Sequence, residues 1–319
     1  MLYKTRISSL LKESNLIKGD IHFSPVSDGM SGAVVLVCND QYVVKYIHSS
    51  LIDDVTMSQC RNEYDFYQQH AGQLDFLPEV IFQTANDDEL LLVFKRYEAI
   101  LPKRWDSTLQ QQAMDIYARI NSLDYTAYSK SSLWSETELE PGRYSLIESY
   151  NNWMQLYNKF PVKLDASVLK EMYDNFYLIA AYADGLPIPN TFCHGDLAQP
   201  NFLLDGAKLL VCDWQYTLIG KGISAVAFFC LRGIDLGLKI DRDVLISRYS
   251  EALNKYMGIA VTPDILTRYA TASEWMIAFR YAAEHMQDSD VDRVVGSYMG
   301  MVENYKAIQN YNIKIIPYR

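Results

Sequence analysis

The chain has 319 residues, of which 49% are hydrophobic and 21% are charged, and its formal net charge is −10. This length favours about two structural units, and this composition is typical of a globular protein with a sizeable core. The acidic balance, in a sequence without a basic cluster, argues against a protein that binds nucleic acid by neutralising phosphates.

The first part of the chain is predicted to be rich in strands. Residues 1–20 have the apolar spacing of a short helix. The apolar runs 33–38 and 42–47 are separated by Asn39-Asp40-Gln41, which predicts a β-hairpin. After this hairpin we expect one long helix and two further strands, at 56–70, 78–83 and 89–94.

Beyond a predicted hinge at 94–99 the sequence becomes mainly helical. Apolar residues recur at helical spacing over 109–123, 144–160, 166–183, 224–237, 242–257, 263–286 and 291–308. A hairpin interrupts this pattern, because short apolar runs surround Asp205-Gly206, a strong turn signal. The pattern predicts an α+β fold, with a small antiparallel β lobe holding one helix over 1–95 and a larger helical lobe over 96–319.

The cysteines and the apolar segments bear on the cellular location. The five cysteines are scattered, and they form no CxxC pair and no Cys/His spacing typical of zinc. We therefore expect free thiols in a reducing compartment. No apolar stretch of signal-peptide length follows Met1, and no run of about 18 apolar residues predicts a transmembrane helix. These features predict a cytoplasmic protein without a membrane partner.

The segment His194-Gly195-Asp196-Leu197-Ala198-Gln199-Pro200-Asn201 carries the strongest chemical signal. Asp196 and Asn201 form an Asp-x-x-x-x-Asn step, and Asp213 follows the predicted hairpin. The hairpin would bring Asn201 and Asp213 to neighbouring positions, where both can ligate Mg²⁺ while Asp196 faces an incoming hydroxyl. Asp and Asn are also common turn residues. Their order here, with Asp213 completing the set, favours phosphoryl transfer.

Lys45 and Glu63 are the predicted partners of the nucleotide phosphates. Lys45 lies in the second strand of the first hairpin, in an apolar run where an unpaired charge is costly. Glu63 lies on the following helix and is the expected partner of Lys45, although Asp65 is a nearby substitute. Such a pair would aim the ammonium group at the α and β phosphates of a nucleotide.

A turn-rich loop precedes the first hairpin strand. Gly29 and Gly32 would let backbone N–H groups approach phosphate closely, and Ser31 is the side chain expected to reach it. The same composition is common in plain turns, so the position ahead of Lys45 is what favours phosphate binding.

These motifs resemble the aminoglycoside phosphotransferase/choline kinase-like branch of the protein-kinase superfamily. In that family the loop reads His-Gly-Asp-(Leu/Phe/Trp)-x-x-x-Asn and the later metal site reads Ile-Asp-Trp/Phe, whereas protein kinases carry His-Arg-Asp and Asp-Phe-Gly. The resemblance is sharpest over 192–230 and weaker over 27–98. It implies a bilobal protein-kinase-like fold, Mg²⁺ with ATP or GTP, and transfer of the γ-phosphate to a hydroxyl group on a small molecule.

The sequence departs from the family pattern at two places. Asn121 stands where a His is common, and Ser224-Ala225-Val226-Ala227 replaces an Asp-Leu-Ala step. The second departure bears on the support of the loop more than on its chemistry. The resemblance assigns His194 a structural task, the bracing of the catalytic loop.

The predicted function is that of a small-molecule kinase, in which 1–95 binds the nucleotide and 96–319 carries the catalytic and substrate residues. The acidic balance would suit a cationic acceptor. Candidate acceptor residues are acidic and aromatic: Glu274, Trp275, Tyr281, Glu284, Asp288, Asp290 and Asp292. The alternatives are a protein kinase, against which Gly195 and Trp214 argue, and a nucleotide-binding pseudokinase. The sequence leaves open the acceptor, the choice between ATP and GTP, and the oligomeric state.

Overall fold

The computed structural model describes residues 2–26, 32–124, 145–311 and 313. By their contacts these residues divide into two compact units. The first unit contains the described residues up to 105 together with 194–217, and the second contains the others. The units are therefore not continuous in sequence. The predicted division into 1–95 and 96–319 follows chain order and stays a prediction.

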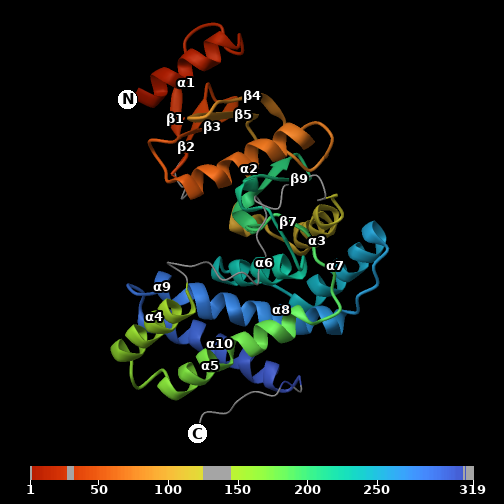
Figure 1. Ribbon diagram of the computed structural model, residues 1–319. Coiled ribbons are helices and arrows are strands. Elements are labelled where there is room, and N and C mark those ends of the chain that lie inside the picture. Colours follow the sequence, from red (N-terminus) through yellow and green to blue (C-terminus); the bar gives the residue numbers. More distant parts are fainter. Residues whose placement is uncertain (1, 27–31, 125–144, 312, 314–319) are drawn as a thin grey trace. The chain divides into compact units, whose positions relative to one another are not determined.

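The first unit is built on an antiparallel five-stranded sheet with the order β1-β2-β3-β5-β4 (Figure 1). Its strands are β1 (Phe23–Pro25), β2 (Val34–Cys38), β3 (Tyr42–His48), β4 (Val80–Ala85) and β5 (Glu89–Lys95). Asn39 and Asp40, between β2 and β3, have positive φ angles of 50° and 55°. A tight hairpin turn requires such angles, and Asn and Asp tolerate them better than most residues. The predicted small antiparallel sheet is confirmed.

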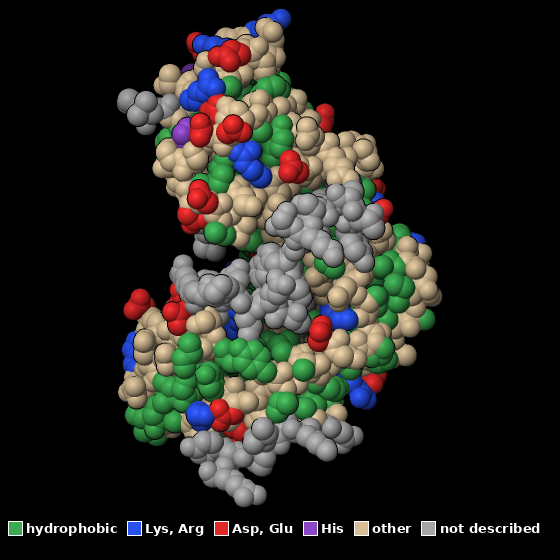
Figure 2. Space-filling view, viewed as in Figure 1, with side chains coloured by type: hydrophobic (Ala, Val, Ile, Leu, Met, Phe, Trp, Pro, Cys, Tyr) green, Lys and Arg blue, Asp and Glu red, His purple; other side chains and the backbone are tan. Residues whose placement is uncertain are grey.

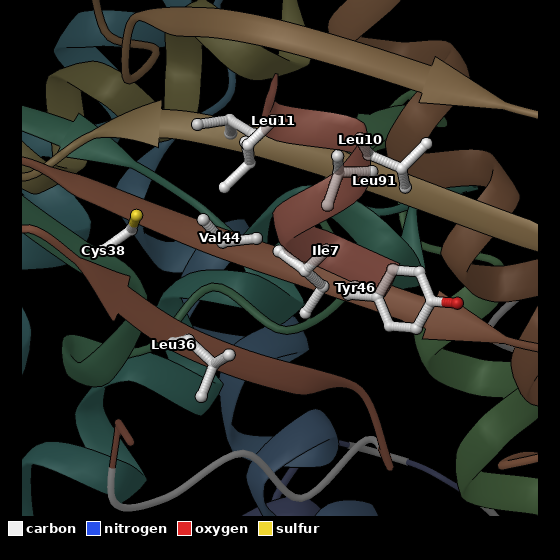
Figure 3. Packing of buried hydrophobic residues seen from close by; sticks show 9 residues of the cluster. Ile7, Leu10, Leu11, Leu36, Cys38, Val44, Tyr46 and Leu91 are labelled. Atoms are coloured by element: carbon white, nitrogen blue, oxygen red, sulfur yellow. The ribbon is translucent and has the colours of Figure 1, made fainter. Parts of the chain in front are cut away.

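One helix covers each face of this sheet. In Figure 3, Ile7, Leu10 and Leu11 of α1 (Leu2–Glu13) lie against Val44 and Leu91 of the sheet. On the other face, Ile47 and Leu90 pack against Met57 and Cys60 of α2 (Asp54–His70). Since side chains alternate between the two faces of a strand, Val44 and Tyr46 of β3 point toward α1, and Lys45 between them points toward α2. The position of Lys45 thus follows from the register of the strand.

The predicted second hairpin belongs to a three-stranded sheet with the order β6-β8-β9. Its strands are β6 (Glu98–Ala99), β8 (Phe202–Asp205) and β9 (Lys208–Val211). Short 3₁₀ turns flank the hairpin at Gln199–Asn201 and at Trp214–Tyr216. The predicted hairpin is confirmed. The strand β6 was not predicted, because two residues are too few to show a strand pattern in the sequence.

The second unit is mainly helical, as predicted (Figure 1). Its longer helices are α3 (Ser107–Asn121), α4 (Leu146–Lys159), α5 (Ala166–Asp184), α6 (Ile223–Asp235), α7 (Arg242–Met257), α8 (Pro263–Ile277) and α10 (Val291–Gln309). Several begin after a residue whose side chain accepts a hydrogen bond from the first turn: Asp106, Ser145, Asp165, Asp241 and Asp290. The strand pair β7 (Thr191–Cys193) and β10 (Leu218–Gly220) was not predicted, because three residues show no alternation.

The helix predicted over 263–286 contains a π-helical turn, Ala278–Ala282, before α9 (Ala283–His285). A π turn leaves backbone carbonyl groups without their usual α-helical partners. Trp153 Nε1 donates to the carbonyl oxygen of Phe279 and Ser149 Oγ donates to that of Arg280, each over 3.0 Å. These two side chains of α4 satisfy the irregular turn and join the two helices.

One face of the molecule carries charged side chains of both signs (Figure 2). On the face in Figure 2, the visible Lys and Arg side chains lie scattered among Asp and Glu. Within the described ranges, no helix combines the length and the apolar character needed to cross a membrane.

Candidate active site

Lys45, Glu63 and Asp213 form a cluster of charges within the first unit. Lys45 Nζ lies 2.6 Å from Glu63 Oε2 and 2.7 Å from Asp213 Oδ1. Glu63 is 1% exposed and also accepts a hydrogen bond from the backbone N–H of Trp214. The expected ion pair of Lys45 and Glu63 therefore forms. Asp213, which follows the second hairpin, joins this pair as a second partner of Lys45.

Burial and charge act together on the ionisation of this cluster. Burial by itself would lower the pKa of Lys45, but the carboxylates of Glu63 and Asp213 outweigh burial and raise it above the ordinary value. Burial raises the pKa of Glu63, and the negative charge of Asp213 adds to this effect, while Lys45 opposes it. Two carboxylates share one ammonium group, so the cluster has a surplus of negative charge that a cation would neutralise.

Asp213 and Asn201 occupy the open end of the second hairpin. Phe202 pairs with Val211, and the backbone N–H of Cys212 donates to the carbonyl oxygen of Asn201 over 3.0 Å. Asp213 then leaves the strand in the left-handed conformation, with φ 68° and ψ 61°. Asp adopts this conformation more readily than β-branched residues do. The hairpin thus places Asn201 beside Cys212, the residue directly before Asp213.

Asn201 is joined to Asp196 by its amide nitrogen. Asn201 Nδ2 donates to the backbone oxygen of Asp196 over 2.6 Å and to Asp196 Oδ2 over 3.2 Å. These bonds turn the amide nitrogen toward Asp196, which leaves the amide oxygen for another ligand. Asp196 itself is half-buried.

His194 braces the loop as a neutral side chain. Its Nε2 donates to the carbonyl oxygen of Cys212 over 2.9 Å, and its Nδ1 accepts from the backbone N–H of Asp196 over 3.3 Å. A carbonyl oxygen only accepts and a backbone N–H only donates, so these contacts fix the tautomer with hydrogen on Nε2. Burial lowers the pKa of His194 to about 4, which keeps the ring uncharged.

An aromatic stack joins the loop to α2. The ring of Trp214 lies nearly parallel to that of Phe66, with centroids 3.9 Å apart. The centroid of the His194 ring lies 4.6 Å from that of Trp214. Phe66 is three residues from Glu63 on the same helix. Trp214 stood out in the sequence as a family signature, but no pattern there identified Phe66 as its partner.

Gly195 is held by a close approach of two segments. Its φ is +85°, and a Cβ atom at this position would lie 1.8 Å from the carbonyl oxygen of Tyr216. No side chain fits this distance, so Gly195 is required by backbone conformation and by space. Tyr216 was missed by the sequence analysis because the contact joins residues far apart in the chain.

The donor set suits Mg²⁺. Among the described residues, no group of three or more His, Cys, Asp or Glu side chains is arranged as a metal site. Mg²⁺ does not need such a cage, because it keeps several water molecules and binds through one or two carboxylates plus substrate phosphates. The carboxylate of Asp213 and the amide oxygen of Asn201 are hard oxygen ligands of this kind, and the surplus negative charge around Lys45 fits a cation.

The remaining predicted phosphate ligands lie around the N-terminal loop. Gly29 and Ser31 are outside the described residues. Gly32 is exposed, has φ +70°, and lies close to Ile52, since a Cβ atom on Gly32 would be 2.7 Å from Ile52 Cγ2. Phosphate binding by this loop stays a prediction.

At the predicted hinge, two backbone amides already have partners. The N–H of Lys95 donates to the carbonyl oxygen of Glu79 over 3.0 Å, and that of Arg96 donates to the carbonyl oxygen of Gln41 over 2.8 Å. An adenine base would therefore have to use other backbone groups of 94–99.

The acceptor candidates differ in their surroundings. Glu274 is buried and forms an ion pair with Arg242 over 2.7 Å, and Trp275 is fully buried. Both belong to the interior of the helical unit. Asp290 caps α10 by accepting from the N–H of Arg293, and Asp288 and Asp292 are exposed beside it, which agrees with a solvated cap. Tyr281 and Glu284, at the π turn and the α9 turn after it, are partly buried.

Comparisons with known proteins bear on this site. Residues 22–236, more than half of the chain, match the model of the phosphotransferase enzyme family. No curated protein sequence matches the chain.

Several solved structures have a similar fold. A choline kinase from Cryptosporidium parvum is 12% identical with a TM-score of 0.65, and the match covers 98% of each chain. The GDP complex of wild-type aminoglycoside 2'-phosphotransferase-IIIa is 12% identical with a TM-score of 0.61, covering 95% of this chain and 99% of that one. The streptomycin–ATP ternary complex of APH(2")-IIa is 15% identical with a TM-score of 0.57, covering 93% and 95%. At these identities the likeness establishes the protein-kinase-like fold, as predicted.

Proposed function

The chain belongs to the phosphotransferase enzyme family, and from this premise we propose that it is a kinase that transfers the γ-phosphate of ATP to a hydroxyl group of a small molecule. The observation that carries the proposal is the cluster of Lys45, Glu63 and Asp213, which the backbone bond between Cys212 and Asn201 links to the pair of Asp196 and Asn201. Phosphoryl transfer depends on charge stabilisation and positioning more than on covalent chemistry, and this cluster supplies both.

Each residue has a role in the proposal. Lys45, held by Glu63, binds the nucleotide phosphates, and Asp196 accepts a hydrogen bond from the acceptor hydroxyl and orients it for attack. Asn201 fixes Asp196 through its amide nitrogen and offers its amide oxygen, with the carboxylate of Asp213, to Mg²⁺. Bound Mg²⁺ would supply positive charge to the phosphates. GTP is the alternative nucleotide.

The acceptor is proposed to be a small hydroxyl compound. The solved structures with the same fold include kinases bound to gentamicin, streptomycin and kanamycin, and choline kinases. The net charge of −10 suits a cationic acceptor of this general kind. A cytoplasmic location stays a prediction.

A protein substrate is the second candidate function. Gly195 argues against a protein substrate through family likeness, because protein kinases carry His-Arg-Asp where this chain has His194-Gly195-Asp196. The close contact between Gly195 and Tyr216 adds that no larger residue fits at this position of the loop. A pseudokinase is disfavoured because Lys45, Asp196, Asn201 and Asp213 are all present and arranged together.

The proposal is tested by ATP consumption in the presence of a panel of aminoglycosides, amino alcohols and sugars. We expect one class to raise turnover, and we expect Asp196→Asn to lower kcat at least about 100-fold while nucleotide binding persists. Asp205→Asn is the matched control, because Asp205 lies exposed at the tip of the same hairpin.

An Asp196→Asn enzyme with full turnover would contradict the mechanism. Nucleotide binding without turnover against any acceptor would favour the pseudokinase. Phosphorylation of a generic protein substrate, with all small hydroxyl compounds inert, would favour the protein kinase.

A further inference from the structure

The strands β7 and β10 close the base of the segment that carries the proposed catalytic residues. β7 ends at Cys193, directly before His194, and β10 begins at Leu218, directly after Thr217. Cys193 pairs with Leu218 and Thr191 pairs with Gly220. The segment 194–217 is therefore a long loop whose two ends leave from one antiparallel strand pair. Whatever fixes this pair also fixes the ends of the loop.

The strand pair is short and needs outside support. An isolated two-stranded ribbon of this length is not stable in water. Asn121, at the end of α3, is 3% exposed and donates from Nδ2 to the carbonyl oxygen of Phe192 over 2.9 Å. Its Oδ1 accepts from the hydroxyl group of Tyr249 on α7 over 2.7 Å. One buried amide thus ties the middle of β7 to two helices.

The same amide also meets the chain that leaves β10. A Cβ atom on Gly222 would lie 2.4 Å from Asn121 Oδ1 and 2.5 Å from the Tyr249 hydroxyl oxygen. Cβ atoms essentially never approach another heavy atom this closely, so position 222 has room only for hydrogen. We call Asn121, Tyr249 and Gly222 the amide node. It therefore joins the two segments at the base of the loop, which are β7 and the residues that follow β10.

A hydrogen-bonded node specifies one arrangement in a way that apolar packing does not. Both the nitrogen and the oxygen of the Asn121 amide have a partner, and a buried polar atom left unpaired is destabilising. A shift of β7 along α3 would break the bond of Asn121 to Phe192, whereas apolar side chains would tolerate the shift. The node is thus suited to fixing a position as well as to adding stability.

We propose that the amide node is a positioning device for the catalytic segment, with Asn121 as its central positioning residue. The node does not touch the reacting groups; it fixes the strand pair from which the loop bearing Asp196, Asn201 and Asp213 departs. The catalytic role of this segment rests on the proposed function, but the positioning of the segment by the node does not.

Hydrogen exchange tests the mechanical claim on the full chain without nucleotide. We expect Tyr249→Phe, which removes the hydroxyl donor to Asn121, to raise amide exchange in 194–217 by about tenfold or more. Gly222→Ala, which crowds the node from the other side, should do the same. Tyr305→Phe is the matched control, because Tyr305 is also buried and its hydroxyl group bonds Glu171 and Asn175 at 3.0 and 3.1 Å.

Kinetics separate positioning from plain loss of stability. With Mg-ATP and water as the acceptor, or the acceptor found by screening, Tyr249→Phe should lower kcat about tenfold and leave the KM for ATP unchanged. Tyr305→Phe should lower thermal stability alone. Because an Asn121→Ala variant already lacks the node, adding Tyr249→Phe to it should produce no further loss of kcat.

Two results would overturn the proposal. One is exchange in 194–217 that is equal in Tyr249→Phe, Tyr305→Phe and the wild-type chain. The other is additive losses of kcat in the double variant. If the wild-type chain shows no turnover, the proposed function fails, but the exchange measurement still decides whether the node positions the segment.

Discussion

Gly195 sets the tightest constraint at the residue scale, because backbone conformation and space act at the same position. A residue with a Cβ atom at φ +85° costs about 1 kcal/mol through strain. The clash with the carbonyl oxygen of Tyr216 must be relieved by moving the loop or the segment after Asp213. Both movements would disturb groups that we propose to be catalytic.

Gly195→Ala is therefore expected to lower the free energy of unfolding by about 3 kcal/mol or more, and to abolish turnover. Chemical denaturation and ATP consumption measure these effects. Gly206→Ala is the matched control, since Gly206 has φ +64° but a Cβ atom added there would meet no atom within 4 Å, so only the strain of about 1 kcal/mol should appear. Equal losses in the two variants would refute the steric argument.

His194 makes the stability of the chain depend on pH. Burial lowers its pKa to about 4, whereas the ordinary value is 6.5. Between these values the unfolded chain binds more protons than the folded chain, so acid favours unfolding. The contribution of neutral His194 is fully present above about pH 6.5 and is lost as the pH falls toward about 4.

We expect the wild-type chain to lose about 2 kcal/mol of unfolding free energy through His194 between about pH 7 and about pH 5. His194→Gln keeps an amide donor for the carbonyl oxygen of Cys212 but does not titrate in this range. Urea denaturation at both pH values should therefore show a smaller pH dependence in the variant. Identical pH dependence would mean that His194 is not held neutral by burial.

Among the elements, the strand β3 contacts a helix on each face, and these contacts determine the position of Lys45. Val44 and Tyr46 pack toward α1, while Lys45 between them points to Glu63 of α2. The helix α1 is further joined to the sheet by Arg6, which binds Glu89 through two nitrogen atoms. Residues 2–13 lie before the region that matches the family, so this support is additional to the matched part of the chain.

Leu11→Ala should test the contribution of α1, because Leu11 is fully buried in the cluster of Figure 3. Removal of its side chain should lower the free energy of unfolding by about 3 kcal/mol, through lost burial and a cavity. Lys12→Ala, on the exposed side of the same helix, should change it by less than about 0.5 kcal/mol. Similar effects of the two variants in thermal denaturation would contradict the packing assigned to α1.

At the scale of the whole molecule, the proposed nucleotide-binding groups are concentrated in one unit. Lys45, Glu63, Asn201 and Asp213 all belong to the first unit, although Asn201 and Asp213 come from the second half of the chain. The fold thus joins two distant segments of sequence around the proposed phosphate site. The helical unit supplies the strand pair β7–β10 at the ends of the later segment.

Mg-ATP should therefore protect the first unit from hydrogen exchange, above all around β3, α2 and 201–213. At about 100 times its Kd a ligand that binds only the folded state stabilises it by about 2.7 kcal/mol. Lys45→Met should reduce the protection, because the ammonium group that meets the phosphates is lost. Protection confined to α5 and α10 would place the nucleotide elsewhere.

Short-range chemistry made much of this protein predictable. The Asp-Gly turn between two apolar runs predicted the second hairpin, and with it neighbouring positions for Asn201 and Asp213. In the structure Asn201 bonds Cys212, the residue directly before Asp213, because hairpin pairing is a local property. Helical periodicity likewise predicted the helices, whose hydrogen bonds and caps are formed between residues near in sequence.

Contacts between distant segments were decided only by the tertiary structure. The carbonyl oxygen of Tyr216 against Gly195, Phe66 beneath Trp214, and Tyr249 on Asn121 each join residues whose spacing carries no periodic signal. The sequence by itself determined which groups are available for the chemistry, since charge and donor type belong to single residues. Only the fold determined how those groups are held, because a close contact or a buried hydrogen bond depends on where two remote segments meet.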